Sequence, residues 1–325
     1  MHMIYLFYLV FLIVAELIYF KIADHFNIID KPNHRSSHAV ITIRGGGIVF
    51  PISVFIWFIC SGFQYPLFAG GLFLISAVSF VDDVKNISRR LRLAIHIIAM
   101  ALVFWQLHLF AFNWLILIGI FFFFTGVINA YNFMDGINGI TGVYSLVLLL
   151  SLLWINQYKF HFVDTNLLVA GVIGVMVFNF FNFRKKAVCF AGDSGSISMA
   201  FIICFLLVKL IVLTDNLTYI LLLAVYGVDA VSTIAIRLYR KENIFQAHRS
   251  HLYQLLVNEK GYQHLTVASL YGIAQIIITI LLLNMPVWNP YEIIGIFLIT
   301  ILIIYILIRS NINIHQTERP TTINS

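Results

Sequence analysis

The chain consists of long apolar segments separated by short polar connections. A helix crosses a bilayer with roughly 20 apolar residues, and we predict membrane-spanning helices at 3–23, 45–63, 66–81, 91–112, 114–131, 137–156, 166–183, 195–214, 217–237, 265–284 and 291–309. Only 10% of the residues are charged, against about 25% in a soluble domain. The sequence therefore predicts an all-α polytopic integral membrane protein with about 10–11 transmembrane helices in one domain, residues 1–309, and a disordered tail, residues 310–325.

The basic residues lie almost entirely on one side of this predicted bundle. The connections after the odd-numbered segments, with the adjoining helix ends and the tail, hold 18 of the 20 Lys and Arg residues. The other side has Lys159, and Lys209 lies inside a helix. Because positively charged connections stay in the cytoplasm, we expect the N-terminus outside, the C-terminus inside and no nucleic-acid partner. The 3 cysteines have no metal-site spacing, and we expect no disulfide.

Four aspartates fall on the same predicted cytoplasmic side. Asp82 and Asp83 follow an apolar run, Asp135 lies in "NFMDGINGI", and Asp193 lies in "AGDSGS". Carboxylates at the mouth of a membrane span are costly and mark candidate sites. Each one alone is equally well explained as an interfacial residue or a helix cap. All four on one face indicate a cation, and oxygen ligands suit Mg²⁺, which binds one or two carboxylates together with substrate phosphates.

Glycine-rich and basic motifs accompany these acids. "RGGG" at 44–47 and "GDSGS" at 192–196 open predicted helices, where bare amides can bind an anion or small residues can let helices pack closely. "AHRSHLYQ" contains His248, Arg249 and His251, which either clamp a phosphate or form a solvated basic loop. Arg35, in "DKPNHRSSH", is expected to neutralise a phosphate or to anchor its loop to anionic lipid.

Acids for a divalent metal, basic residues for phosphate and glycine-opened helices together indicate phosphoryl transfer between a soluble donor and a lipid acceptor. Two alternatives remain. A proton-coupled transporter would place its charges near the bilayer midplane, often in repeated, broken helices, whereas here they lie at one face and no repeat is visible. A catalytically inactive scaffold would tolerate replacement of the acids without loss of activity.

The ordered motifs "PNHRSSH…RGGG", "DDVKN", "NFMDGINGI", "FAGDSGS" and "HRSHLYQ" resemble those of the polyprenyl-phosphate N-acetylhexosamine-1-phosphate transferases. These enzymes are relatives of the phospho-N-acetylmuramoyl-pentapeptide transferases. The resemblance covers residues 30 to 254 and is strongest to bacterial enzymes that start O-antigen or capsule repeat units. It implies a catalytic transmembrane domain in the bacterial inner membrane, Mg²⁺ or in its place Mn²⁺, and a UDP-N-acetyl sugar and undecaprenyl phosphate as partners, with a homodimer left open.

The resemblance also assigns roles to residues of this chain. Asp193 would be the metal ligand. Asp82, Asp83 and Asp135 would be catalytic, the first two by orienting or deprotonating the lipid phosphate. The substrate-binding residues would be Arg35, Thr42, Asn132, Asn138, Phe190, His248, Arg249 and His251, with Phe190 stacking on the uracil.

Three positions depart from the family pattern. Asn138 replaces the second acid of the usual "MDGxDG", Ile41 replaces a proline ahead of Thr42, and Ala191 replaces the Met of "FMGD". Asn138 cannot act as a base, so the site has one charge fewer. A lipid phosphate is mostly dianionic at neutral pH, and we therefore expect it to attack the donor directly; a covalent aspartyl-phosphate intermediate is the rival mechanism.

Overall fold

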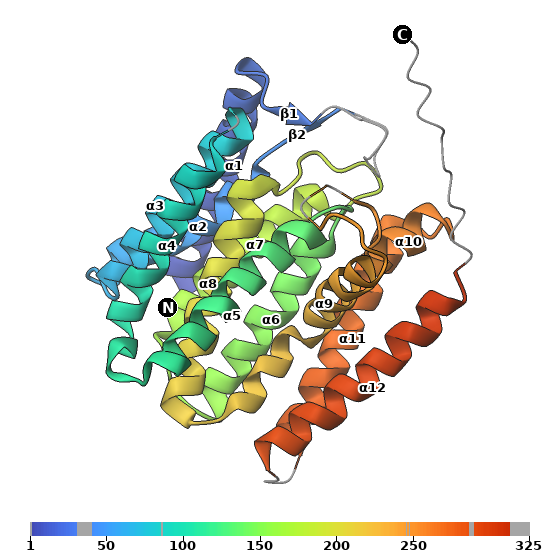
Figure 1. The fold of residues 1–325 in the computed structure, drawn as a ribbon. Helices are drawn as coiled ribbons and strands as arrows, with labels where there is room; N and C mark the ends of the chain where they lie inside the picture. The colour runs from blue at the N-terminus through green and yellow to red at the C-terminus, as the bar shows by residue number, and fades with distance from the viewer. Residues whose placement is uncertain are drawn as a thin grey trace.

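The computed structural model describes residues 2–30, 41–85, 87–244, 246, 248–285 and 289–312. In this part of the chain the helices run side by side as one bundle (Figure 1). They are α1 (His2–His25), η1 (Gly46–Ile48), α2 (Val49–Cys60), α3 (Pro66–Val84), α4 (Arg89–Gln106), η2 (Leu109–Ala111), α5 (Trp114–Met134), α6 (Ile140–Tyr158), α7 (Thr165–Asn182), α8 (Gly192–Thr214), η3 (Leu217–Leu223), α9 (Ala224–Tyr239), α10 (Leu252–Asn258), α11 (His264–Asn284) and α12 (Pro290–Ser310).

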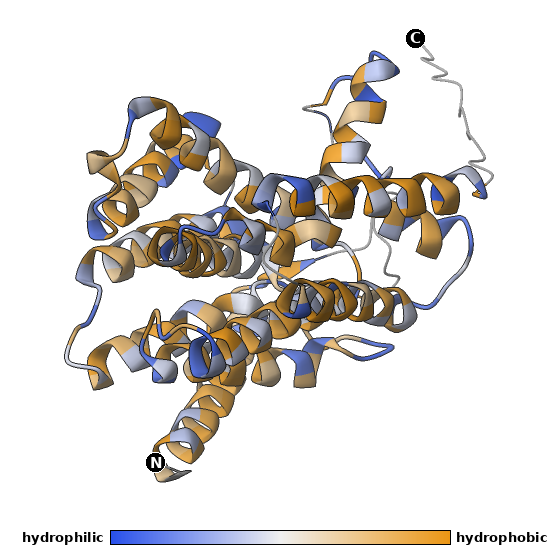
Figure 2. Cartoon of the chain, turned by 90° about the horizontal axis from the view of Figure 1, so that it is seen from below, coloured by the Kyte–Doolittle hydropathy of each residue, from blue (hydrophilic) through white to orange (hydrophobic). Residues whose placement is uncertain are grey.

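Within the described residues, 9 helices are long and apolar enough to cross a membrane. Two predicted spans are not among them: α2 is shorter, and α4 begins with the arginines Arg89, Arg90 and Arg92. Figure 2 shows hydrophobic residues along the lengths of the helices and hydrophilic ones gathered at the connections. The prediction of an all-α, multi-pass membrane protein is confirmed, and the three cysteines are free, as expected.

Helix α8 forms the centre of the bundle. In its most apolar window 72% of the residues are buried, against 17% for α12 at the edge. It packs against α2, α3 and α5, and its first turn meets η1 backbone to backbone. A Cβ on Gly47 would lie 2.4 Å from the Cα of Gly195, so neither position has room for a side chain. The start of α8 is thereby fixed against the start of α2.

A small sheet closes this end of the bundle. Strand β1 (Ile29–Asp30) pairs antiparallel with β2 (Thr42–Ile43), and Ile43 also bridges to Cys189 just before α8. Both strands lie at the same end of the molecule as α10 (Figure 1). The next residue after β2 is Arg44, which is therefore delivered to the N-terminus of α8.

Two helix boundaries differ from the prediction in a way that matters for the site. Helix α3 continues to Val84, so Asp82 and Asp83 lie in its last turn rather than in a loop. Helix α8 begins at Gly192, which puts Asp193 in its first turn. Arg35 and most of the predicted tail lie outside the described residues.

The span from 217 to 239 is broken, because η3 gives way to α9 at Leu223. Irregular backbone inside a membrane protein must be satisfied by neighbouring groups. The side chain of Gln275 in α11 performs this role: its amide donates to the carbonyl of Leu221 at 3.1 Å, and its oxygen accepts from the amide of Val225 at 3.3 Å. Tyr144 also donates to that oxygen, at 2.9 Å.

The break predicts a stability effect at Gln275. Replacing it by Leu leaves the Leu221 carbonyl and the Val225 amide buried without these partners, which should cost about 2 kcal/mol. Thermal unfolding of the purified protein in detergent measures this. The exposed Thr300→Ala on α12 is the control and should change stability by less than about 0.5 kcal/mol; equal midpoints for both variants would contradict the role given to Gln275.

Candidate active site

Three of the predicted aspartates meet at one end of the bundle, joined by two arginines. Arg44 Nε lies 2.8 Å from Asp83 Oδ1, and Arg44 Nη2 lies 3.2 Å from Asp193 Oδ1. Arg92 Nη1 lies 2.8 Å from Asp82 Oδ2 and 3.7 Å from Asp193 Oδ2. The ends of α3 and α8, the residue after β2 and the first turn of α4 thus share one network of charges.

Asp83 is the buried member of this network, with a side-chain exposure of 0%. Its two oxygens accept the amides of Asp193 and Ser194 at 3.0 and 2.9 Å, so it caps the N-terminus of α8. A carboxylate is favoured there by the partial positive charge of the helix end. Gly192 has φ +70°, and a Cβ on it would lie 2.7 Å from Asp83 Oδ2. A glycine is therefore required at this approach.

The acids around Arg44 compensate for the burial of its guanidinium. Burial acts to lower the pKa of its guanidinium, but the carboxylates of Asp83 and Asp193 outweigh burial and raise the pKa above the usual value. Its backbone carbonyl accepts the hydroxyl of Tyr19 at 2.6 Å, which ties this residue to α1. Arg44 therefore remains a fixed positive charge between two negative ones.

Asp82 and Asp193 remain partly open to solvent, with side-chain exposures of 12% and 17%. Asp82 Oδ1 also accepts the amide of Ile87 at 2.8 Å, which fixes the turn between α3 and α4. These two carboxylates, rather than that of Asp83, are the ones that a substrate or a cation can reach.

Asp135, the fourth acid, lies at the end of α5 and accepts the hydroxyl of Thr141 at 2.7 Å. Burial raises its pKa to about 7, and the carboxylates of Asp193 and Asp83 act in the same direction. Asp135 is therefore close enough to these carboxylates for their charge to raise its pKa, and it is protonated for part of the time at neutral pH.

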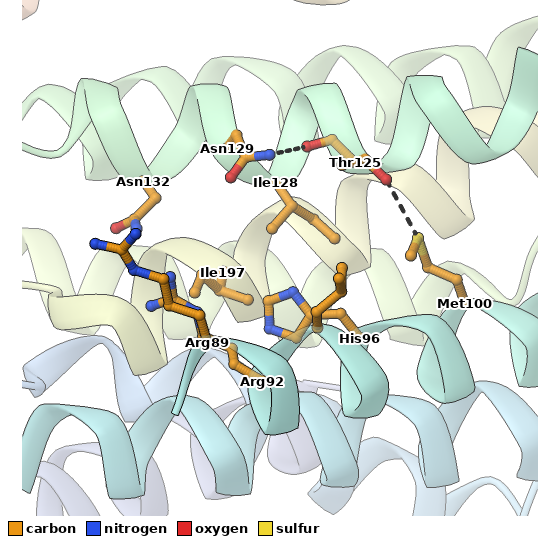
Figure 3. Close-up of a pocket in the computed structure, with 10 residues that line it drawn as sticks. Arg89, Arg92, His96, Met100, Thr125, Ile128, Asn129, Asn132 and Ile197 are labelled. Carbon is orange, nitrogen blue, oxygen red and sulfur yellow. Dashed lines mark hydrogen bonds between the residues drawn. The ribbon is translucent and has the colours of Figure 1, made fainter. Parts of the chain in front are cut away.

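A pocket of about 150 Å³ opens beside this network between α4 and α5. Arg89, Arg92 and Asn132 line its polar end, and Figure 3 shows Arg89 pointing toward Asn132 across it. Farther along, the apolar Met100 and Ile128 line it together with the polar His96, Thr125 and Asn129. The pocket thus leads from the charged end of the bundle into the membrane-spanning region.

Three of the predicted substrate-binding residues lie around the same end. The Oδ1 of Asn132 accepts the hydroxyl of Ser196 at 3.3 Å. Phe190 is half-buried, and its amide donates to the carbonyl of Ile43 at 2.8 Å. Thr42 is buried in β2, two residues before Arg44. These positions are compatible with roles in binding, which stay predictions.

Asn138 is engaged within the protein. Its side chain is 4% exposed, and its amide donates to the carbonyls of Arg184 and Lys185 at 2.9 and 3.3 Å. It therefore ties the connection between α7 and α8 to the start of α6. Its Oδ1 is buried and has no hydrogen-bond partner in the described part of the chain, and the predicted contact between Asn138 and substrate stays a prediction.

The "HRSH" segment lies just before α10, and the rings of His248 and His251 lie 6.3 and 6.2 Å from the ring of Phe133, between Asn132 and Asp135. Residues 248–250 are not helical, His251 is the N-cap of α10, and the two histidine rings lie 5.0 Å apart. Burial, and after it the charges of His251 and Arg237, lower the pKa of His248 to about 4. It is thus neutral at pH 7. Arg249 is half-buried.

The glycine motifs are explained by packing. The amides of Gly46 and Gly47 donate to the carbonyls of Phe190 and Ala191 at 2.8 and 3.1 Å, and the first amides of α8 are taken by Asp83. Of the two interpretations of these motifs, close packing therefore fits and anion binding by their bare amides does not.

The described residues contain no group of three or more His, Cys, Asp or Glu side chains arranged to hold a metal ion. A site made wholly by these side chains is therefore absent from this part of the chain. The partly exposed carboxylates of Asp193 and Asp82 do fit the other mode of Mg²⁺ binding, in which one or two carboxylates are completed by water and substrate phosphates.

Several charged residues that bridge the acids of this site or are buried in the bundle are not predicted from the sequence. Arg44 and Arg92 were counted only as positive charges of the inner side, and nothing in their spacing indicates that they bridge acids. Asp229 and Glu16, both buried, were also missed. Each is the lone carboxyl group of a predicted span. A carboxyl group inside a membrane helix marks a candidate site by itself, and this signal could have identified both residues.

The two neighbouring aspartates should respond differently to replacement. Asp83→Ala removes a buried partner of Arg44 and two amides, which should cost about 3 kcal/mol or more. Asp82→Ala, the matched control one residue earlier, should cost about 1 kcal/mol because its carboxylate is partly solvated. Thermal unfolding in detergent compares them, and a larger loss for Asp82→Ala would refute the capping role of Asp83.

Asp135 predicts a pH effect on stability. An unfolded aspartate loses its proton at about pH 4, whereas folding raises the pKa of Asp135 to about 7. Between these values the folded protein binds more protons, so this residue makes stability fall as pH rises. Asp135→Asn should therefore lose less stability than wild type between about pH 5 and pH 8. Parallel unfolding curves for the two proteins over that range would contradict the prediction.

Comparisons with known proteins agree with the motifs. Residues 65–211 match the family described as glycosyl transferase family 4. The undecaprenyl-phosphate alpha-N-acetylglucosaminyl 1-phosphate transferase of Escherichia coli (strain K12) is 26% identical over 283 residues, 78% of this chain and 74% of the relative. A probable undecaprenyl-phosphate N-acetylglucosaminyl 1-phosphate transferase of Bacillus subtilis (strain 168) is 25% identical over 93% of this chain and 89% of its own length. The predicted resemblance is confirmed at this level: part of the chain matches the glycosyl transferase family 4 model, and most of it is similar to proteins named undecaprenyl-phosphate N-acetylglucosaminyl 1-phosphate transferases.

Proposed function

We propose that the protein transfers the sugar 1-phosphate of a UDP-N-acetylhexosamine to undecaprenyl phosphate, giving undecaprenyl-diphospho-N-acetylhexosamine and UMP. The observation that carries this proposal is the network of Asp82, Asp83 and Asp193 with Arg44 and Arg92, at the end of a multi-pass bundle and beside a pocket that enters it. The names of the relatives supply the lipid acceptor and the transferred group. We further assign the reaction to the start of O-antigen or capsule synthesis at the bacterial inner membrane.

The pocket between α4 and α5 suits the acceptor. A polyprenyl phosphate has a charged head and an apolar chain. Arg89 and Arg92 lie at one end of the pocket for the head, and farther in Met100 and Ile128 would contact the chain beside the polar His96 and Thr125 (Figure 3). Guanidinium groups bind phosphate through paired N–H donors. The phosphate of the lipid would therefore lie beside Asp82 and Asp193 while its chain remains in the membrane.

The chemistry follows from charge. An oxygen of the lipid phosphate attacks the donor phosphorus that carries the sugar, the bond from this phosphorus to the bridging oxygen breaks, and UMP leaves with the electron pair. A phosphate monoester has its second pKa at about 6, so the attacking oxygen needs no strong base. The obstacle is repulsion between two anions, and catalysis consists of aligning them and compensating their charge.

Asp193, with Asp82 beside it, would hold Mg²⁺ together with the donor diphosphate. The ion, when bound, supplies positive charge to the phosphate oxygens in the transition state. Arg92, which contacts both carboxylates, is placed to orient the acceptor phosphate. Phe190, half-buried just before α8, would stack its ring on the uracil.

The direct test is release of UMP by the purified protein. The assay supplies undecaprenyl phosphate, Mg²⁺ and, one at a time, the UDP-linked N-acetyl sugars. UMP that appears only when donor, lipid and metal are all present supports the proposal, and the sugar that gives it identifies the donor. No UMP from any of them, with proton-coupled uptake of a solute into vesicles, would favour the transporter alternative instead.

Asp193 gives the sharpest prediction for this function. Asp193→Asn removes one charge at the first turn of α8 and should lower turnover by about 10²–10³-fold, together with the dependence of the rate on Mg²⁺. Asp215→Asn, at the exposed opposite end of α8, is the matched control and should leave the rate unchanged. Near-normal UMP release from Asp193→Asn would rule out its assignment as the metal ligand.

A further inference from the structure

We propose that Asp229 is a positioning residue for the transfer reaction, because it fixes His251 and the start of α10 against the active site. This inference rests on the proposed function and adds a residue outside the predicted site. Asp229 lies within α9, and it is 2% exposed. A carboxyl group inside a membrane span is costly, so its surroundings must explain why it is there.

The carboxyl group of Asp229 is surrounded by hydrogen-bond donors. Its Oδ1 accepts the amide of Leu252 at 2.9 Å and the hydroxyl of Thr233 at 3.1 Å. Its Oδ2 accepts the hydroxyl of Tyr271 at 2.6 Å and the amide of Tyr253 at 3.5 Å. The two amides are the first of α10, so Asp229 caps a helix that belongs to another segment of the chain.

His251 is the second partner of this carboxyl group. Its Nδ1 lies 3.4 Å from Asp229 Oδ1, and its side chain is 2% exposed. An acceptor beside one ring nitrogen of a histidine decides which nitrogen is left for other partners. In the described part of the chain both ring nitrogens of His251 are buried without a hydrogen-bond partner; Nδ1 faces the Asp229 carboxyl group, which leaves Nε2 for another partner. Such an atom in a folded protein calls for a partner, and a substrate phosphate oxygen is the one that the proposed reaction supplies.

Tyr253 connects Asp229 to the active site. Its amide is held by Asp229, and its hydroxyl donates to the carbonyl of Phe133 at 2.9 Å. The same hydroxyl would lie 2.2 Å from a Cβ on Gly136, so the ring rests directly on the backbone on both sides of Asp135. One buried carboxyl group therefore connects His251 to the segment that carries Asn132 and Asp135.

Two arginines hold the rest of this segment. Arg309 of α12 donates to the carbonyl of Ser250 at 2.8 Å, and Arg237 of α9 donates to the carbonyl of Asn243 at 2.6 Å. Asn243 and Ser250 are thus attached by charged side chains of two membrane-spanning helices. Asp229 is the one among them that contacts both the backbone of α10 and a predicted phosphate-binding side chain.

Asp229→Asn in the full-length protein tests the proposal. The amide keeps the shape, its oxygen can still accept from Leu252, and its nitrogen can donate to the hydroxyl of Tyr271, which is free to rotate. The unfolding midpoint should therefore stay within a few degrees of wild type. The kcat/KM for UMP release should fall by about tenfold or more, because this is the usual effect of removing a partner that fixes the orientation of a binding side chain.

A double variant separates positioning from general stability. If Asp229 acts through His251, Asp229→Asn should cause little further loss of kcat/KM in a His251→Ala background, because residues that work as a unit are not additive. Tyr271→Phe is the matched control: it removes a hydrogen bond to Oδ2, the oxygen of Asp229 that does not face His251, and leaves the charge, and should cost less than about threefold. Additive losses, or an Asp229→Asn enzyme as active as wild type, would overturn the proposal.

Two further measurements keep the test decisive. If Asp229→Asn does not fold, Tyr253→Phe replaces it: loss of the bond to Phe133 should lower kcat/KM with an unchanged midpoint, and full activity would refute the connection. Amide hydrogen exchange of residues 248–258 needs no turnover. Faster exchange there in Asp229→Asn supports positioning even if wild type releases no UMP, an outcome that would defeat the proposed function alone, whereas unchanged exchange counts against positioning.

Discussion

The contact between Arg44 and Asp83 holds the active end of the bundle together. Asp83 is fully buried, and its oxygens are shared between Arg44 at 2.8 Å and the first amides of α8. A buried charge without these partners would be strongly destabilising. Because the contact joins the end of α3, the residue after β2 and the start of α8, the positions of Asp82 and Asp193 follow from it: one is the neighbour of the cap, and the other is the first capped residue.

Charge in this molecule is concentrated where helices end. Asp83 accepts the first amides of α8 and Asp229 those of α10, so each of these two carboxyl groups closes the N-terminus of a helix from another segment of the chain. In water such amides could bind solvent, but near the membrane interior they need a protein partner. The same groups that stabilise the fold therefore also fix the segments that carry Asp193 and His251. The hydrogen bonds that stabilise these helix ends therefore also determine where the site residues lie.

The spans and the order of motifs could be predicted because both are local. A run of apolar residues marks a helix by itself, and Asp82, Asp135 and Asp193 each sit beside such a run. The partners of these residues could not be predicted, because they depend on which ends meet. In the sequence Arg44 resembles an ordinary basic loop residue. Gly46 and Gly47 resemble residues whose amides are free to bind an anion, but in the structure these amides donate to the carbonyls of Phe190 and Ala191. Asn138 shows the same limit, since its amide is taken by a connection 46 residues away.

The surroundings of the paired aspartates bear on the choice between direct and covalent transfer. A carboxylate that attacks phosphorus needs a free oxygen with access to substrate. Asp83 has neither, because Arg44 and two amides occupy its oxygens and it is closed to solvent. Asp82 is more open, but it accepts from Ile87 and pairs with Arg92. Direct attack by the lipid phosphate needs no oxygen from either residue. It would use Arg92 in its present position, where it lines the pocket proposed for the acceptor. The geometry therefore favours direct transfer, in which the acids organise charge and the nucleophile belongs to the substrate.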